Sequence, residues 1–318
     1  MSRDAADRRV RNGVDTTLQV LGQWLVPLQD KAIVAVPARP LWWTSAASMV
    51  PEMDGARAAA RTYFGRFIDT TGLPPAFAGA LVEYAARRGV SKIFDREYFS
   101  VNRGRLEGRY FGGFVPRDLR VPLPVEGDGD RALLTLDTLD RFVGRPVFDA
   151  ILLEFLTSSR GTRPSLDDFV AVASRVGGQD LSWLFDEALK TPRQFDYAIT
   201  AFDSRQDTDG RFRTTVTVRR LGDGVFRRGV PVVTTFAGGD SVTETFDGRN
   251  EQATYEYRSQ GPARTASVDP DAFLLLDRNR GNNGMSLDTQ SARTAANRWT
   301  ARWLIWLEDA LLTYVALT

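Results

Sequence analysis

The sequence predicts an α+β protein in which a helical first half is followed by an antiparallel β-sandwich and a C-terminal helix. Two observations support this prediction. Apolar residues recur at helical spacing in most segments before residue 190, most strongly from 130 onwards, and from about residue 194 the period changes to alternation between Asp/Gly turns. The chain has 318 residues, of which 43% are hydrophobic and 25% charged, so it has enough apolar material for about two domains.

The first 53 residues predict one helix, one strand and one loop. An amphipathic helix is expected over residues 9–28, where apolar side chains recur every three or four positions. The β-branched run over 32–36 is bounded by Pro37 and Pro40, and its length and composition favour a short strand. Residues 41–53, with two adjacent tryptophans, are typical of a loop.

Two further helices are predicted between residues 54 and 89. Asp54 has the chemistry of an N-cap for a helix over 56–69. Pro74 and Pro75 are suited to open a second helix, because proline is tolerated in the first helical turn. Gly89 is expected to end it as a C′ glycine. The segment 91–129 is rich in glycine and proline and weakly periodic, so we expect it to be irregular.

Four short helices with short connections are predicted next, and such helices form an antiparallel array. Their expected ranges are 130–143, 146–158, 166–176 and 181–190. Ser165 followed three residues later by Asp168 resembles a capping box at the start of the third helix.

Five strands are predicted after residue 194, separated by turns such as Asp209-Gly210 and Asp247-Gly248. Strands at roughly ten-residue spacing are typical of a β-sandwich or an open barrel, and we expect the sandwich. Their expected ranges are 195–202, 211–220, 230–236, 240–246 and 252–258. The last segment, from Ser286 to Leu317, predicts a helix with several tryptophans along one side.

The chain contains no histidine and no cysteine. This composition excludes disulfides, thiolate nucleophiles, a Ser-His-Asp triad and histidine-ligated zinc or haem. A metal bound by this chain alone would need oxygen ligands, which favours calcium or magnesium. The most regular acidic cluster is Glu126, Asp128 and Asp130, with Asp137 further on, but it has Arg131 where a calcium loop needs glycine. We therefore interpret it as a solvated loop.

Two other acidic segments, 207–210 and 269–271, are interpreted as turns. The 41 Lys and Arg residues are balanced by 40 Asp and Glu, so charge gives no argument for nucleic-acid binding. The N-terminus has no apolar signal region, and no run of about 18 apolar residues occurs. We therefore expect a cytoplasmic location by default.

The segment over 54–88 carries the most specific signal. It contains ARTYFG at 60–65 and PPAFAGALVEY at 74–84. This pattern resembles the catalytic segment of the gluzincin zinc aminopeptidases, the aminopeptidase N family, in which an HExxH helix and a following helix supply the zinc ligands. The resemblance extends over most of residues 10–280, including GTRPSLDDF at 161–169 and LSWLFD at 181–186.

The resemblance implies a thermolysin-like catalytic-domain remnant that lacks the family's large N-terminal β-domain. On this interpretation the remnant covers residues 1–129 and the helical array over 130–192 completes it. A β-sandwich over 193–280 and an amphipathic helix over 281–318 follow.

Aligning the family's motif on Tyr63-Phe64-Gly65 places Arg57 and Arg61 at the two histidine positions and Ala58 at the general base. The third ligand falls on Gly79 or Ala80. Two permanent cations cannot ligate zinc and repel it. Glu83 on the next helix is the partner that we expect for them. Two alternatives remain open for Arg57, Arg61 and Glu83: an ion-pair network that fills the vacated site, or a binding site for a carboxylate or phosphate.

The resemblance therefore implies a metallopeptidase-family pseudoenzyme with a degenerate zinc site, with no catalytic or metal-binding residues and no cofactor, although the family would use zinc. Such a protein would act by binding a protein or peptide, or by assembly. One alternative is an active zinc-dependent aminopeptidase that uses unrecognised ligands or a partner chain.

A second alternative is a membrane-surface protein. Trp299, Trp303 and Trp306 lie beside Arg298 and Arg302, a pattern found in helices at membrane interfaces. The acidic pair at 308–309 weakens the apolar side of this helix, which favours packing on its own domain instead.

Overall fold

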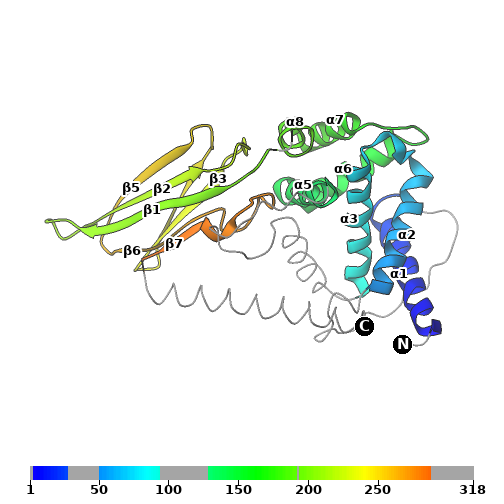
Figure 1. The fold of residues 1–318 in the computed structure, drawn as a ribbon, viewed down its shortest axis with the longest axis horizontal. Coiled ribbons are helices and arrows are strands. Elements are labelled where there is room, and N and C mark those ends of the chain that lie inside the picture. The colour runs from blue at the N-terminus through cyan, green and yellow to red at the C-terminus, as the bar shows by residue number, and fades with distance from the viewer. Residues whose placement is uncertain (1–2, 28–49, 94–127, 192, 288–318) are drawn as a thin grey trace. The chain divides into compact units, whose positions relative to one another are not determined.

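The computed structural model describes residues 3–27, 50–93, 128–191 and 193–287. These residues divide into two compact units, one containing the helices through Ser182 and one running from Trp183 through the strands (Figure 1). The predicted α+β class is confirmed, because helices precede two antiparallel sheets. The predicted strand over 32–36, the irregular segment over 94–127 and the C-terminal helix from residue 288 onwards lie outside the described residues.

The first unit begins with α1 (Arg3–Trp24), α2 (Val50–Phe67) and α3 (Pro75–Ile93). The predicted N-cap at Asp54 is wrong, because α2 already begins at Val50, within the segment expected to be a loop. Pro51 lies in the first turn of α2, where its missing N–H removes no intrahelical hydrogen bond. Glu52, also in that turn, is an acidic residue at the favourable end of the helix dipole.

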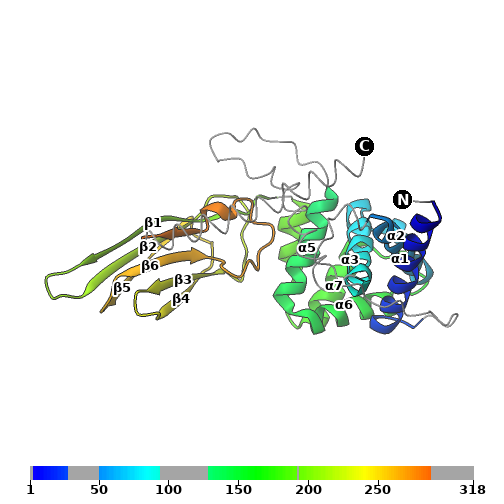
Figure 2. The ribbon, with the colours of Figure 1, turned by 90° about the horizontal axis from the view of Figure 1, so that it is seen from below.

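The helices α1, α2 and α3 pack against one another (Figure 2), and glycines permit their closest approaches. A Cβ atom at Gly13 of α1 would lie 2.0 Å from the carbonyl oxygen of Glu52. One at Gly55 of α2 would lie 2.0 Å from the carbonyl oxygen of Val10. The α1–α2 crossing is therefore a backbone-to-backbone contact, which only glycine allows at these two positions.

Gly89 does not end a helix as predicted, because α3 continues to Ile93. A Cβ atom at Gly89 would lie 2.0 Å from the hydroxyl oxygen of Thr17 on α1. The glycine therefore serves packing between α1 and α3. Sequence alone does not distinguish this role from a C′ position, because both need the absence of a side chain.

Three helices of the predicted array are α5 (Asp128–Val143), α6 (Arg145–Ser158) and α7 (Leu166–Gly177). Their ranges agree with the prediction to within two residues. The segment 128–130 forms the first turn of α5, so the interpretation of that acidic cluster as a loop is wrong there.

The predicted capping box of α7 is confirmed. The backbone N–H of Asp168 donates to the Ser165 hydroxyl at 3.2 Å, and the N–H of Ser165 donates to the Asp168 carboxylate at 2.8 Å. Gly178 follows the helix in the left-handed conformation with φ of 67°.

Aromatic packing joins α3, α6 and α7 into one core. The ring of Phe169 lies edge-on to Phe77 and Phe155, with centroid distances of 4.9 and 5.0 Å. All three side chains are buried. Across the described residues no helix combines the length and the apolar character that a membrane span requires.

The second unit is a two-sheet β-sandwich. A short helix, α8 (Ser182–Phe185), and one π-helical turn (Asp186–Lys190) precede the strands. One sheet has the order β1-β2-β5 and the other β4-β3-β6-β7, and all neighbours are antiparallel. The strands are β1 (Tyr197–Gln206), β2 (Phe212–Arg220), β3 (Val230–Phe236), β4 (Ser241–Phe246), β5 (Gln252–Ser259), β6 (Ala263–Val268) and β7 (Gly284–Ser286). This two-sheet arrangement is the architecture of immunoglobulin-like domains.

The five predicted strands are confirmed, and in β2 and β3 the alternation places every second side chain in the core. Val216 and Val218 of β2, Val232 of β3 and Val268 of β6 are all 0% exposed, so both sheets contribute to this core. The Asp209-Gly210 turn is also confirmed, with Gly210 at φ of 79°. The strand β7 ends at Ser286, where the sequence predicts the beginning of a helix.

Candidate functional site

Arg57 on α2 and Glu83 on α3 form a two-point ion pair between neighbouring helices. The Nε atom of Arg57 donates to Oε2 of Glu83 at 2.6 Å, and Nη2 donates to Oε1 at 3.1 Å. Nη1 also donates to the carboxylate of Asp54, one turn earlier on α2, at 3.3 Å. The side chains of Arg57 and Glu83 are 40% and 22% exposed. The predicted partnership between these two residues is present.

Arg61 lies one turn further along α2 and does not join this pair. Its side chain is exposed, and it makes no hydrogen bond or ion pair with a described residue. The buried side of α2 includes instead Met53, Ala56, Ala59, Ala60, Tyr63, Phe64 and Phe67. The three residues predicted to form one site are therefore two paired residues and one separate exposed cation.

The residues at the zinc positions of the resemblance do not fit zinc. Arg57 and Arg61 are permanent cations, and Gly79 and Ala80 have no donor atom. Among the residues that the structure describes, no group of three or more acidic side chains could hold a metal ion. Glu83, the nearest carboxylate, has both oxygens occupied by Arg57.

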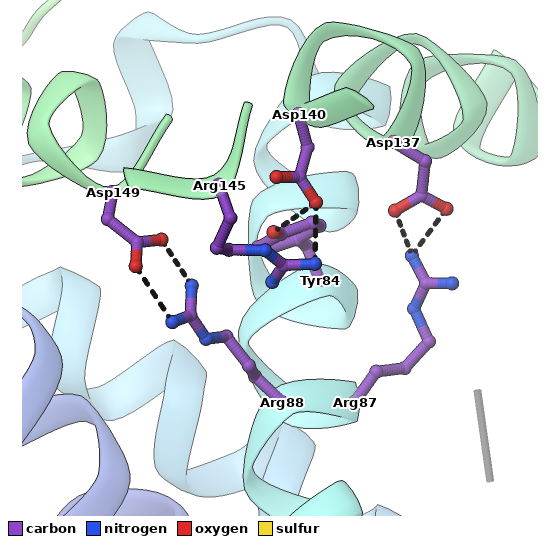
Figure 3. A network of polar contacts seen from close by, with 7 residues as sticks. All are labelled: Tyr84, Arg87, Arg88, Asp137, Asp140, Arg145 and Asp149. Atoms are coloured by element: carbon purple, nitrogen blue, oxygen red, sulfur yellow. Dashed lines mark hydrogen bonds and ion pairs between the residues drawn. The ribbon is translucent and has the colours of Figure 1, made fainter. Parts of the chain in front are cut away.

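A larger polar network begins one turn later on α3 and was not predicted from the sequence (Figure 3). Arg87 is 1% exposed, and its Nη2 donates to the two oxygens of Asp137 on α5 at 3.0 and 2.9 Å. A buried guanidinium needs such a partner, because an unpaired charge inside a protein is strongly destabilising.

The centre of the network is Asp140 of α5. The hydroxyl of Tyr84 donates to its Oδ2 at 3.0 Å, and Nη2 of Arg145 lies 2.7 Å from the same oxygen (Figure 3). Burial raises the pKa of Asp140, and the nearby Arg145 and Tyr84 oppose that rise. Burial also raises the pKa of Tyr84 well above its ordinary value, with the negative charge of Asp140 adding to the effect.

The third part of the network is Arg88, which joins α3 to α6. Its guanidinium pairs with both carboxylate oxygens of Asp149, and Nη2 lies 2.9 Å from Oδ2 (Figure 3). The same guanidinium stacks 3.6 Å from the ring centroid of Trp24 at the end of α1. This cation–π contact and the ion pair fix Arg88 from two sides.

Ion pairs therefore join successive helices throughout the first unit. Arg9 of α1 pairs with the buried Glu52 of α2 at 2.5 Å, and Arg175 of α7 pairs with Glu154 of α6 at 2.8 Å. Only three of the chain's 41 basic residues are lysines, and this preference for arginine fits such pairs, because a planar guanidinium bridges a carboxylate at two points. The arrangement holds helices together, and none of its members is a free nucleophile or an unpaired general base.

One signal in the sequence could have indicated the network. Glu83 and Arg87, and likewise Tyr84 and Arg88, are four residues apart on an otherwise apolar helix. Charged residues at that spacing on a buried helix require partners from neighbouring helices. Their identity depends on packing between segments about fifty residues apart, which periodicity alone does not give.

The remaining candidates have simple roles. Asp207 accepts from the N–H of Gly210 at 3.0 Å through its carbonyl, as expected for a hairpin turn. Asp269 accepts from the N–H groups of Phe273 and Leu274 at 2.8 and 3.0 Å, which confirms turn chemistry. Trp299, Trp303 and Trp306 lie outside the described residues, so their contact with a membrane surface stays a prediction.

Comparison with solved structures reveals a distant likeness to a peptidase. The chain matches the crystal structure of Legionella pneumophila aminopeptidase A in complex with aspartic acid, with a TM-score of 0.52 and 11% sequence identity. The match covers 86% of this chain and 35% of that one, so the chain spans about a third of the aminopeptidase's length. No family model and no curated protein sequence matches the chain. The likeness supports a distant peptidase-like fold.

Proposed function

We propose that this protein is a non-catalytic member of the aminopeptidase-like fold, which acts by binding a protein or peptide or by assembly. The observation that carries the proposal is the ion pair between Arg57 and Glu83 at the positions where the resemblance places zinc chemistry. A zinc peptidase needs neutral or anionic ligands and a general base. Here a cation takes a ligand position and neutralises the nearest carboxylate.

The composition supports the same conclusion independently of the alignment. With no histidine or cysteine anywhere in the chain, a zinc site would have to consist of oxygen ligands alone. The two acidic residues that contact this position, Glu83 and Asp54, are both already engaged with Arg57.

The binding role is best carried by Arg61. Arg57 is held by two carboxylates, whereas Arg61 is exposed at the next turn of the same face of α2. An exposed guanidinium binds a carboxylate through paired hydrogen bonds. A peptide with a free C-terminal carboxylate is therefore the ligand class that fits this position.

Zinc content and peptidase activity test the loss of catalysis. We expect the purified full chain to contain far less than one zinc per molecule after incubation with zinc and dialysis, measured by atomic emission. We also expect no chelator-sensitive hydrolysis of aminoacyl substrates. Stoichiometric, tightly bound zinc or chelator-sensitive hydrolysis would establish the alternative, an active metallopeptidase with ligands not recognised here.

Matched arginine substitutions on α2 test the binding role. We expect Arg61→Ala to abolish the binding of a pool of peptides with free C-termini, measured by fluorescence anisotropy. Arg66→Ala, which removes another exposed arginine of the same helix, should leave it unchanged. C-terminal amidation of the peptides should have the same effect as Arg61→Ala. Equal binding by all the variants would contradict a role for this position.

A further inference from the structure

The strand β5 forms one margin of the β1-β2-β5 sheet (Figure 1). It pairs with β2 over its whole length, from the Arg219–Gln252 pair to the Phe212–Ser259 pair, without a register shift. No described residue pairs with its other side. An edge of this kind presents a row of N–H and C=O groups that can pair with another strand.

The register identifies which backbone groups face outward. The N–H of Arg220 donates to the carbonyl of Glu251 at 2.8 Å, and these two residues lie directly opposite each other. In an antiparallel pair, hydrogen-bonded and non-hydrogen-bonded positions alternate. The backbone groups of Tyr255 and Tyr257 therefore point toward β2, and those of Glu256 and Arg258 point toward the free edge, as do those of Gln252 and Thr254.

The other described sheet margins are interrupted, as in β1, or shorter than β5, as in β4 with six residues and β7. The strand β1 has a register shift between Ile199 and Ala201, and β7 has three residues. On β4 the carbonyl oxygen of Thr245 accepts the hydroxyl of Tyr255 at 3.3 Å. The eight residues of β5 contain no proline and no bulge, which are two of the usual devices that prevent edge pairing, and their two charges are of opposite sign.

We propose that β5 pairs with β5 of a second copy of this chain, antiparallel and about a two-fold axis at Tyr257. In this register Glu256 of each copy lies opposite Arg258 of the other, so two complementary charge pairs form. Each pair has outward-facing backbone groups on both sides and exchanges both of its N–H···O bonds. The two sheets then form one continuous six-stranded sheet.

Other two-fold registers are less favourable. An axis at Glu256 would place two carboxylates directly opposite each other, which is destabilising. An axis at Tyr255 would pair Thr254 with Glu256 and Gln252 with Arg258, without opposing charges. At the proposed axis the two Tyr257 residues lie opposite each other in a non-hydrogen-bonded pair, and each ring keeps its edge-on contact with Phe236 of its own copy, 6.0 Å between centroids.

The present partner of Arg258 does not prevent this pairing. Its Nη1 lies 3.8 Å from Asp209, and the side chains are 58% and 49% exposed. Such a loose surface pair contributes little to stability. Glu256 has no ion pair with a described residue and is exposed. Both side chains are therefore available to a second copy.

Charge substitution and sedimentation equilibrium of the full chain test the proposal. We expect the wild-type chain to form a concentration-dependent dimer. Glu256→Arg places two arginine pairs at the interface and should raise the dimer dissociation constant about tenfold, and Arg258→Glu should act alike. The double variant E256R/R258E restores both pairs in reversed order and should restore the wild-type dissociation constant.

The double variant also controls for folding. It carries both substitutions, so if it dimerises normally, neither substitution prevents the chain from folding. A wild-type chain that stays monomeric at every concentration would overturn the proposal. So would a dimer that the single substitutions leave unchanged, or one that the double variant does not restore. If the chain stays monomeric and binds an extended peptide along β5, the edge has a different occupant. That result would also overturn the proposal that a second copy pairs there.

Discussion

Arg87 and Asp137 form an ion pair in which the cation is almost completely buried and the carboxylate is not. The arginine side chain is 1% exposed and the aspartate 13%. The two members of the pair therefore depend on it unequally. Arg87 needs Asp137 to balance a charge that water does not reach, whereas Asp137 retains some solvation of its own.

Replacing Asp137 by alanine should therefore be severely destabilising. The substitution leaves the Arg87 charge without its main partner, and losing one member of a buried pair costs about 3–5 kcal/mol. Glu154→Ala is the matched control, because it breaks the exposed pair with Arg175 in the same unit. That change should cost less than about 1 kcal/mol. Urea unfolding of both variants gives the comparison, and equal losses would contradict the role assigned to Asp137.

Substitution of Gly13 by alanine tests the contact between α1 and α2. The added Cβ atom would meet the carbonyl oxygen of Glu52, so the helices must separate, at a cost of about 1–3 kcal/mol. Gly65→Ala on α2 is the control, because a Cβ atom there has nothing within 4 Å. It should stabilise the protein by about 0.5–1 kcal/mol, as alanine favours a helix over glycine. Thermal unfolding measures the midpoint temperature of each variant. A shift of both midpoints in the same direction would refute the prediction.

The stability of the second unit should fall as pH rises from about 4 to about 7, because of Asp277. This residue is 1% exposed, and burial raises the pKa of its carboxyl from 3.8 to about 7 against the opposing hydrogen bonds from Asn283 and Asn279. Asp196 is a second carboxyl nearby and adds to the rise, while Arg280 opposes it. The folded state therefore favours the protonated form of Asp277. Its contribution to the free energy of unfolding is complete only below the carboxyl's ordinary pKa of 3.8, and it is lost as the pH rises to the folded-state value of about 7.

The difference between the two pKa values of Asp277 corresponds to about 4 kcal/mol of unfolding free energy, lost between about pH 4 and pH 7. Asp277→Asn cannot ionise and keeps a similar size, so its unfolding free energy should lack this component of the pH dependence. Chemical unfolding at pH 4, 5.5, 7 and 8 for both proteins measures the difference. Parallel pH profiles for wild type and variant would show that Asp277 does not ionise in this range.

The helices and strands with strong local signals were predictable. Ser165 and Asp168 specify the start of α7 within four residues of sequence, so no tertiary information was needed. The strands β1 to β5 have clear alternation and glycine turns. The strand β6, with its short ARTASV sequence, and the three-residue β7 have weak patterns, and they become strands through pairing with β3 and with each other.

The candidate site was predictable only in part. The pairing of Arg57 with Glu83 follows from two helices that are adjacent in sequence and carry opposite charges. The isolation of Arg61 depends on how α2 rotates against α3. The network around Asp140 depends on how α3, α5 and α6 rotate against one another. That rotation is set by the whole apolar core, and no local pattern records it.

The crossing of α1 and α2 limits how this sequence can diverge. At Gly13 and Gly55 the opposing group is a backbone carbonyl, which every amino acid at the opposite position would present equally. A mutation at either glycine therefore has no compensating side-chain mutation on the other helix. These two positions should stay glycine in homologous chains while the residues around them vary.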